Sequence, residues 1–175
     1  MDGFSLSDRP LDAAAISALS SGLASSHAGA LVTFEGRVRA TNDGRTVIGL
    51  EYDAYPALCL KEGQAVIDEA AAQPGVLGAR CVHRVGDLAV GDVAVWIGVI
   101  CGHRGEAFAA CRYIIDEVKR RVPIWKKEHY ADGTSGWIGV ETARPAPSER
   151  PAPLERPAAS EHPAPSERPG SPRAS

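Results

Sequence analysis

Residues 93–100 read Val-Ala-Val-Trp-Ile-Gly-Val-Ile, and this run decides the fold of the chain. A continuous apolar run of this length is typical of a strand covered on both faces, so it predicts the centre of a sheet. The next segment, 105–122, has apolar residues at the 3.6-residue period of an amphipathic helix. These residues are Ala107, Phe108, Cys111, Ile114, Ile115, Val118 and Val122.

Two strand patterns and a turn signal lie closer to the N-terminus. Residues 29–39 and 46–55 predict strands, and Asn-Asp-Gly at 42–44 predicts the turn of an antiparallel hairpin. A helix over 10–24 is expected to follow Asp8 or Ser7 as its N-cap. The other expected elements are a helix over 56–73, strands over 76–85, 124–129 and 136–140, and a turn-rich connector over 86–92. This mixture predicts an α+β domain with a mixed or antiparallel sheet, not a doubly wound one.

The C-terminal segment, 143–175, differs from the rest of the chain in composition. It holds nine of the thirteen prolines, no aromatic residue, and Glu-Arg-Pro or Glu-His-Pro at a six-residue period. Such a segment cannot bury enough apolar surface to offset its ordering entropy, so it predicts a disordered tail with polyproline II character. A solvated tail and a ligand for proline-reading modules both fit this composition. We therefore expect one domain over 1–142 and a tail over 143–175.

Composition argues against several classes of protein. The formal net charge of −3 does not favour bulk nucleic-acid binding. No apolar run approaches the roughly 20 residues that span a bilayer, and the first residues lack the pattern of a signal peptide. The cytosol is therefore the expected compartment, with no membrane partner. The four cysteines form no CxxC pair and are expected as buried free thiols. No metal site, cofactor or glycine-rich phosphate loop is expected.

A cluster of cations lies at the end of the helix predicted over 105–122. Residues 119–128 read Lys-Arg-Arg-Val-Pro-Ile-Trp-Lys-Lys-Glu, with five cations around a proline and a tryptophan. In an acidic chain this local positive charge predicts an anionic partner or a lysine chemistry. Lys119 lies at the edge of the apolar helix face, where both snorkelling and a pKa lowered by desolvation fit its position. Lys126 and Lys127 favour the second reading, because one of them can converge on the same cleft.

Two further pairs of polar residues are candidates for an anion site. His103 and Arg104 lie between the central strand and the helix after it, where backbone N–H groups and the helix dipole favour anions. Arg37 and Arg39 alternate along the strand predicted over 29–39, so they are expected on one face of it. Each pair has a structural alternative, namely a helix cap with a solvated arginine, or cations that guard an edge strand.

Three blocks of residues carry a resemblance to a known family. They are Phe34-Glu35-Gly36-Arg37-Val38-Arg39, Gly102-His103-Arg104, and Lys119 followed by Val122-Pro123-Ile124-Trp125-Lys126-Lys127-Glu128. Together with His83-Arg84-Val85-Gly86 and Val90-Gly91-Asp92, they resemble the large, catalytic subunit of molybdopterin synthase. The resemblance covers roughly residues 5–140, and its most specific part is Pro-x-Trp-Lys-Lys-Glu. The tail lies outside it.

The resemblance implies a fold, an activity and partners. The fold is an α/β hammerhead. The activity converts cyclic pyranopterin monophosphate into molybdopterin by installing two sulfurs as a dithiolene. The sulfur comes from the C-terminal Gly-Gly thiocarboxylate of a small ubiquitin-like subunit, and two large subunits form a dimer within a heterotetramer.

The resemblance also implies site residues. Lys119 and Lys126 become the catalytic candidates. The expected substrate contacts are Arg37, Val38, Arg39, His103, Arg104, Lys127 and Glu128, with His103 and Arg104 able to serve the neighbouring subunit's pocket.

Two other functions fit parts of the pattern. A non-catalytic scaffold would bind the tail of a ubiquitin-like protein in the basic cleft without chemistry. A single-stranded nucleic-acid binder would use Trp125 and Tyr130 beside the cations, but the acidic net charge and the aromatic content of 6% argue against it. The resemblance favours the sulfurtransferase.

Overall fold

The computed structural model describes residues 3–138, which form nine strands and three helices. In chain order these are β1 (Gly3–Ser7), α1 (Ala13–Ser21), β2 (Ala30–Arg37), β3 (Thr41–Asn42), β4 (Arg45–Ala54), α2 (Pro56–Ala71), β5 (Val76–Arg84), β6 (Gly86–Ala89), β7 (Val93–Cys101), α3 (Arg104–Arg121), β8 (Ile124–Tyr130) and β9 (Ser135–Ile138). The tail predicted over 143–175 lies outside the described residues. None of the three helices is both long and apolar enough to cross a membrane.

The first sheet is built around β7, as the apolar run predicts. Its order is β1-β5-β7-β2, with β1 parallel to β5 and the other pairs antiparallel, so the sheet is mixed. All nine residues of β7 are buried. The predicted α+β class with a mixed sheet and the predicted central strand are both confirmed.

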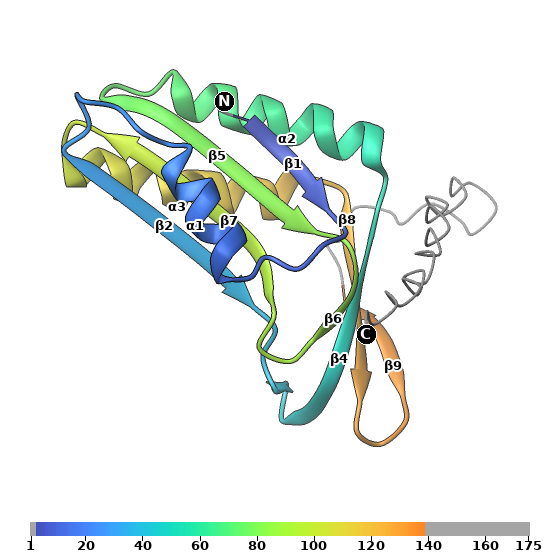
Figure 1. Cartoon of the computed structure of the whole chain (residues 1–175). Helices are drawn as coiled ribbons and strands as arrows, with labels where there is room; N and C mark the ends of the chain where they lie inside the picture. Colours follow the sequence, from blue (N-terminus) through green and yellow to red (C-terminus); the bar gives the residue numbers. More distant parts are fainter. Residues whose placement is uncertain (1–2, 139–175) are drawn as a thin grey trace, which may run out of the picture.

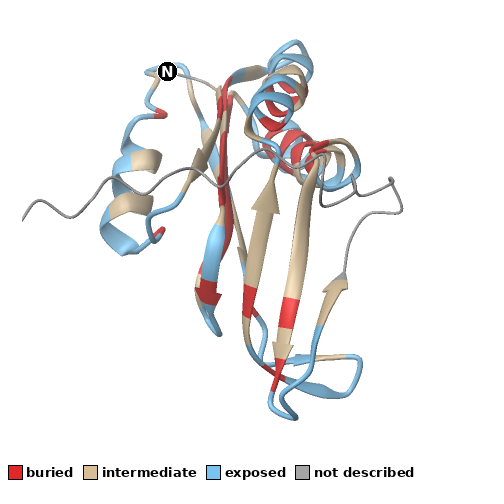
Figure 2. Cartoon of the chain, turned by 90° about the vertical axis from the view of Figure 1, so that its right-hand side faces the viewer, coloured by how far each residue is buried: buried red, intermediate tan, exposed pale blue. Residues whose placement is uncertain are grey.

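Helices cover both faces of this sheet. Figure 2 shows α1 on one side and α2 and α3 on the other. On the side of α2 and α3, Val95, Ile97 and Val99 pack in one cluster with residues of both helices. On the α1 side, Trp96 and Ile100 pack with Leu11, Leu23 and Val82. The alternation of β7 side chains between two covered faces explains why the run is apolar without interruption.

The second sheet has the order β3-β4-β8-β9, and β6 also pairs with β4 (Figure 1). The chain passes from the first sheet to the second between Arg84, the last residue of β5, and Gly86, the first of β6. Gly86 has φ +81°, a left-handed conformation that glycine adopts without strain. A small cluster of Val38, Leu50, Leu88 and Ala94 joins the two sheets.

The predicted turn at 42–44 is confirmed. Asn42 pairs with Arg45 across the hairpin, which leaves a two-residue loop of Asp43 and Gly44. Both loop residues have positive φ, 48° and 76°, as a type I′ turn requires. This turn places β3 beside the first residues of β4.

The start of the chain differs from the prediction. Asp12 is the N-cap of α1, and its side chain accepts a hydrogen bond from the Ala15 N–H at 2.8 Å. The predicted caps Asp8 and Ser7 were wrong, because Ser7 ends β1 in register with Arg84 of β5. Neither β1 nor β6 was predicted, since both are short strands in which a single residue is buried.

Phe108 is an exception on the apolar face of α3. Its side chain is exposed, at 63%, whereas Ala107, Cys111 and Ile114 are buried. Phe108 and the half-buried Ile115 are seven residues apart, so they lie on one line at the edge of the buried stripe. Lys119 continues this line at the next turn. The centre of the predicted apolar stripe is therefore buried as expected, whereas its edge at Phe108 is exposed.

A glycine in α2 allows β1 to pack against the helix. A Cβ added to Gly63 would lie 2.2 Å from Cγ of Phe4. We expect Gly63→Ala to lower the free energy of unfolding by about 1–3 kcal/mol, because the buried ring has to move. This loss exceeds the helix-propensity gain of at most about 1 kcal/mol. Urea unfolding measures the change.

Gly105 provides a matched control in another helix. It lies in the first turn of α3, and a Cβ there would meet no atom within 4 Å. Gly105→Ala should therefore be neutral or raise stability by up to about 1 kcal/mol. Equal stability of the two variants would mean that Phe4 does not press on Gly63 in solution.

Candidate functional site

The predicted site residues fall into two groups at opposite ends of the domain. Because α3 runs back along the sheet after β7, Lys119 in its last turn lies near the start of β7. Arg37 pairs with Val93 there, so it lies at the same end. His103 and Arg104 begin α3, about 22 Å from Lys119 along the helix axis at about 1.5 Å per residue. One protomer therefore does not bring the two groups together.

Half-buried Lys126 and buried Glu128 form an ion pair on one face of β8. Lys126 Nζ lies 2.8 Å from Glu128 Oε1, and the Tyr130 hydroxyl donates to Oε2 at 3.0 Å. Glu128 is 3% exposed. Burial acts to raise the pKa of Glu128, but the hydrogen bonds from Lys126 and Tyr130 outweigh it and the pKa is lowered. The carboxylate is thus ionised and holds the Lys126 ammonium in place.

Lys127 lies on the opposite face of β8, as the two-residue period of a strand requires. Its Nζ is 4.0 Å from Glu51 Oε2 and 5.8 Å from the centroid of the Trp137 ring. The adjacent lysines thus face two different environments, and Lys126 alone shares a face with Glu128.

Arg39 reaches the Lys126–Glu128 pair through Asn42. Its Nη2 lies 3.4 Å from Asn42 Oδ1. The Asn42 side chain in turn hydrogen-bonds to Glu128 and to Tyr130. Arg39 is thereby part of the polar cluster on the second sheet. Sequence reasoning missed Asn42, because its contact depends on the strand pairing.

Arg37 contacts a different part of the molecule. It forms an ion pair with Glu35 at 2.5 Å and lines a cavity of about 540 Å³ beside α1 that contains no lysine. Because β2 ends at Arg37, its alternation does not extend to Arg39. Val38 between them is buried, and its N–H donates to the carbonyl of Asp92 at 3.0 Å.

Lys119 differs from Lys126 in having no counter-ion among the described residues. It is exposed, and it forms no ion pair or hydrogen bond with any residue within 3–138. Its charge acts on His83, whose pKa it helps to lower. Its ammonium is therefore available to an anion from outside the chain.

His103 is the N-cap residue of α3, but its side chain makes no capping hydrogen bond. Arg104 is exposed beside it and forms no ion pair among the described residues. The structural alternative of a capping histidine is therefore wrong. These two side chains, at the positive end of the helix dipole, are also available to an external anion.

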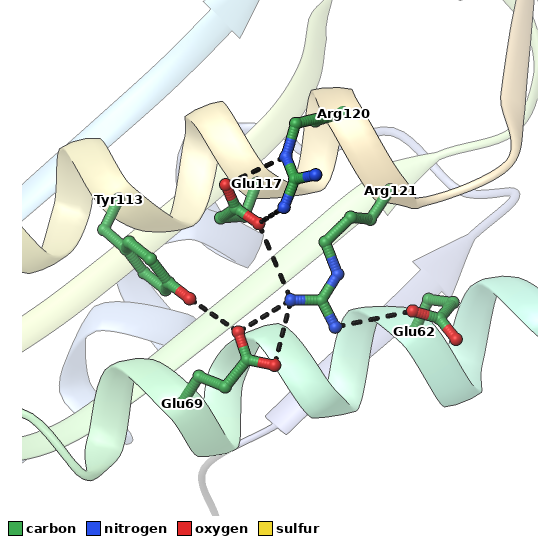
Figure 3. A network of polar contacts seen from close by, with 6 residues as sticks. All are labelled: Glu62, Glu69, Tyr113, Glu117, Arg120 and Arg121. Carbon is green, nitrogen blue, oxygen red and sulfur yellow. Dashed lines mark hydrogen bonds and ion pairs between the residues drawn. The ribbon is translucent and has the colours of Figure 1, made fainter. Parts of the chain in front are cut away.

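The cations next to Lys119 are used to join the helices. Arg121 binds Glu69 of α2 at 2.6 Å and also approaches Glu62 and Glu117, while Arg120 pairs with Glu117 (Figure 3). The hydrogen bond from Arg121, then that from Tyr113, lowers the pKa of Glu69. This network anchors the end of α3 on α2. Of the five cations in 119–128, Arg120 and Arg121 thus have structural partners.

Comparisons with known proteins place the chain in one family. The model of the family described as MoaE protein matches residues 6–121. The molybdopterin synthase catalytic subunit of Nostoc sp. is 43% identical over 140 residues, which cover 79% of this chain and 83% of that one. The corresponding subunit of Synechococcus elongatus is 47% identical over 111 residues, 63% of this chain and 67% of that one.

Solved structures resemble the chain in fold. Molybdopterin synthase from Staphylococcus aureus has a TM-score of 0.72 and 35% identity, covering 80% of this chain and 99% of that one. A complex of subunits 1 and 2 of molybdopterin-converting factor from Helicobacter pylori has a TM-score of 0.64 at 23% identity, covering 79% and 90%. By its sequence and its fold, this chain belongs to the MoaE family, the catalytic subunits of molybdopterin synthase.

Proposed function

We propose that the chain transfers sulfur from the C-terminal thiocarboxylate of a small ubiquitin-like subunit to cyclic pyranopterin monophosphate, which forms the dithiolene of molybdopterin. The observation that carries this proposal is the pair of differently held lysines at one end of the domain. Lys119 lacks a counter-ion among the described residues, whereas Lys126 is fixed by the buried Glu128. The relatives named as molybdopterin synthase catalytic subunits support it.

The two lysines suit two parts of this reaction. Both the thiocarboxylate and the substrate phosphate are anions, so holding them close together requires several cations. Release of the sulfur requires water to add to the acyl carbon, which forms a tetrahedral intermediate with negative charge on oxygen. Its collapse breaks the bond to sulfur and leaves an ordinary carboxylate on the carrier. We assign Lys119 to stabilise this charge and to exchange a proton with the intermediate, because no carboxylate within 3–138 neutralises its ammonium. Lys126 orients the substrate from its fixed position.

The remaining predicted residues are proposed to contact the substrate. Arg39 lies beside the Lys126–Glu128 pair through Asn42, Lys127 adds charge on the other face of β8, Arg37 adds charge at the same end, and Glu128 supports Lys126. Val38 sets the backbone position of the two arginines through its buried side chain. His103 and Arg104 lie too far from Lys119 to act in the same protomer, so a second copy supplies them to a composite pocket.

The proposed assembly has two copies of this chain at its centre and one small subunit at each end. A solved complex of subunits 1 and 2 of molybdopterin-converting factor contains a chain with the same fold as this one, which supports the small-subunit partner. The cytosol is the proposed compartment, because Cys59, Cys81, Cys101 and Cys111 are all buried as free thiols.

The test of this function is a defined reaction. The purified chain is mixed with cyclic pyranopterin monophosphate and a thiocarboxylated small subunit, and the dithiolene pterin is detected after oxidation to its fluorescent derivative. Product should form, and none should form with a carrier that ends in an ordinary carboxylate. Tight binding of the carrier without product would instead identify the chain as a scaffold.

A further inference from the structure

His83 lies between α3, which carries Lys119, and the second sheet, which carries Lys126 on β8. It is the second-to-last residue of β5, just before the chain passes to the second sheet, and it is 8% exposed. His83 is directly opposite Val95 of β7, so both side chains lie on the sheet face that α3 covers. Val95 packs in the same cluster as Val118 and Val122, which flank Lys119. The register thus places His83 beneath the end of α3.

Tyr52 holds the His83 ring from the other side. The two ring centroids are 4.9 Å apart and the planes meet at 88°, an edge-to-face contact. Tyr52 is the direct partner of Lys126 in the pairing of β4 with β8. Burial, followed by the charge of Glu128, raises the pKa of Tyr52, so its hydroxyl stays protonated. His83 therefore lies between Lys119 on α3 and the neighbour of Lys126 on the second sheet.

A single hydrogen bond fixes the tautomer of His83. Its Nδ1 lies 2.7 Å from the carbonyl oxygen of Arg84. A carbonyl oxygen only accepts, so Nδ1 carries the proton, and Nε2 of the neutral ring has a free lone pair. Burial, opposed by the hydrogen bond to the Arg84 carbonyl and assisted by the charge of Lys119, lowers the pKa of His83 to about 4. The imidazole is thus neutral near pH 7 and cannot repel the lysine.

We propose that His83 is a positioning residue for Lys119. The Lys119 ammonium, which makes no hydrogen bond with residues 3–138 of the free chain, turns toward the neutral ring when the site is filled, and Nε2 accepts a hydrogen bond from it and directs it toward the edge where Lys126 lies. No proton is transferred to the ring. The inference rests on the proposed function, because it concerns the same reaction. Besides Lys119 on α3, the charged or titratable groups near His83 are Tyr52 on β4 and, beyond Tyr52, Lys126 and Glu128 on β8.

Two substitutions remove the acceptor in different ways. His83→Phe keeps an aromatic ring against Tyr52 but has no Nε2, whereas His83→Asn keeps a donor for the Arg84 carbonyl but is too short to reach Lys119. Each should lower kcat by about tenfold, the effect of one lost hydrogen bond, with KM for the carrier nearly unchanged. His83→Gln, which offers an oxygen near the position of Nε2, should recover most of kcat.

The control is His129→Phe on β8. His129 lies on the face of that strand away from Lys126 and Glu128, so this variant should keep wild-type kcat and pH dependence. Folded His83→Asn or His83→Phe protein with wild-type kcat would overturn the proposal. Equal losses in the Gln, Asn and Phe variants would also overturn it, since packing alone would then explain them. If the wild-type chain makes no dithiolene, the proposed function itself fails, which is a separate outcome.

Discussion

Replacing Lys119 with alanine is expected to lower the rate of dithiolene formation by about 10²–10³-fold, the usual cost of losing one group that stabilises charge in a transition state. Lys119 is the lysine at this end of the domain whose ammonium has no carboxylate partner among residues 3–138. The other four cations of 119–128 do not replace its charge, because each of them is paired with a glutamate. The loss should appear in kcat more than in the affinity for the carrier.

Single-turnover formation of the dithiolene pterin measures this effect, and calorimetry measures carrier binding. Lys61→Ala is the matched control, because it removes the same charge from an exposed position on α2. The folding of the Lys119 variant should be unchanged, since its side chain is exposed and makes no ion pair with the described residues. Turnover at the rate of the Lys61 control would remove Lys119 from the catalytic centre.

Mixing two inactive variants is expected to restore activity. Lys119→Ala and Arg104→Ala should each abolish most activity alone, since each removes one part of every composite pocket. In a two-fold symmetric dimer of one copy of each, both substitutions fall in the same pocket and the other pocket is intact. Random exchange of subunits should therefore leave about a quarter of all pockets complete. Product formation after unfolding and joint refolding measures this recovery.

The control for this experiment is a mixture of Lys119→Ala with Lys126→Ala. Both residues lie at the same end of one protomer, so each pocket of a mixed dimer keeps one substitution and no activity should return. Recovery in the first mixture but not in the second supports the composite pocket. No recovery in the first mixture, with subunit exchange verified by mass spectrometry, would show that His103 and Arg104 do not serve a neighbouring subunit.

Much of the fold follows from local patterns in the sequence. The apolar run at 93–100 and the periodic stripe over 105–122 predict β7 and α3, and the turn at 42–44 predicts the hairpin. The errors occur where pairing overrides local signals. β1 and β6 have five residues or fewer and carry no recognisable pattern of their own. They form strands because they pair with the longer strands β5 and β4.

The site could be predicted only in part for the same reason. The adjacency of Lys126 and Glu128 follows from the two-residue period of a strand. The contacts of Asn42 with Glu128 and of Tyr52 with His83 depend on the register between distant segments, which a single sequence does not specify. The tautomer of His83 depends on one carbonyl that only the folded backbone places beside it.

The length of α3 has a consequence for how this family can diverge. One rigid helix carries Arg104 in its first turn and Lys119 in its last, and Arg121 fastens its end to α2. In the proposed dimer its eighteen residues therefore set the spacing between the two pockets. Insertion or deletion of one turn, about 5.4 Å, would displace a residue of each pocket at once. Surface loops can change length one at a time, whereas a change in this helix damages both reaction centres together, so natural selection should hold its length constant.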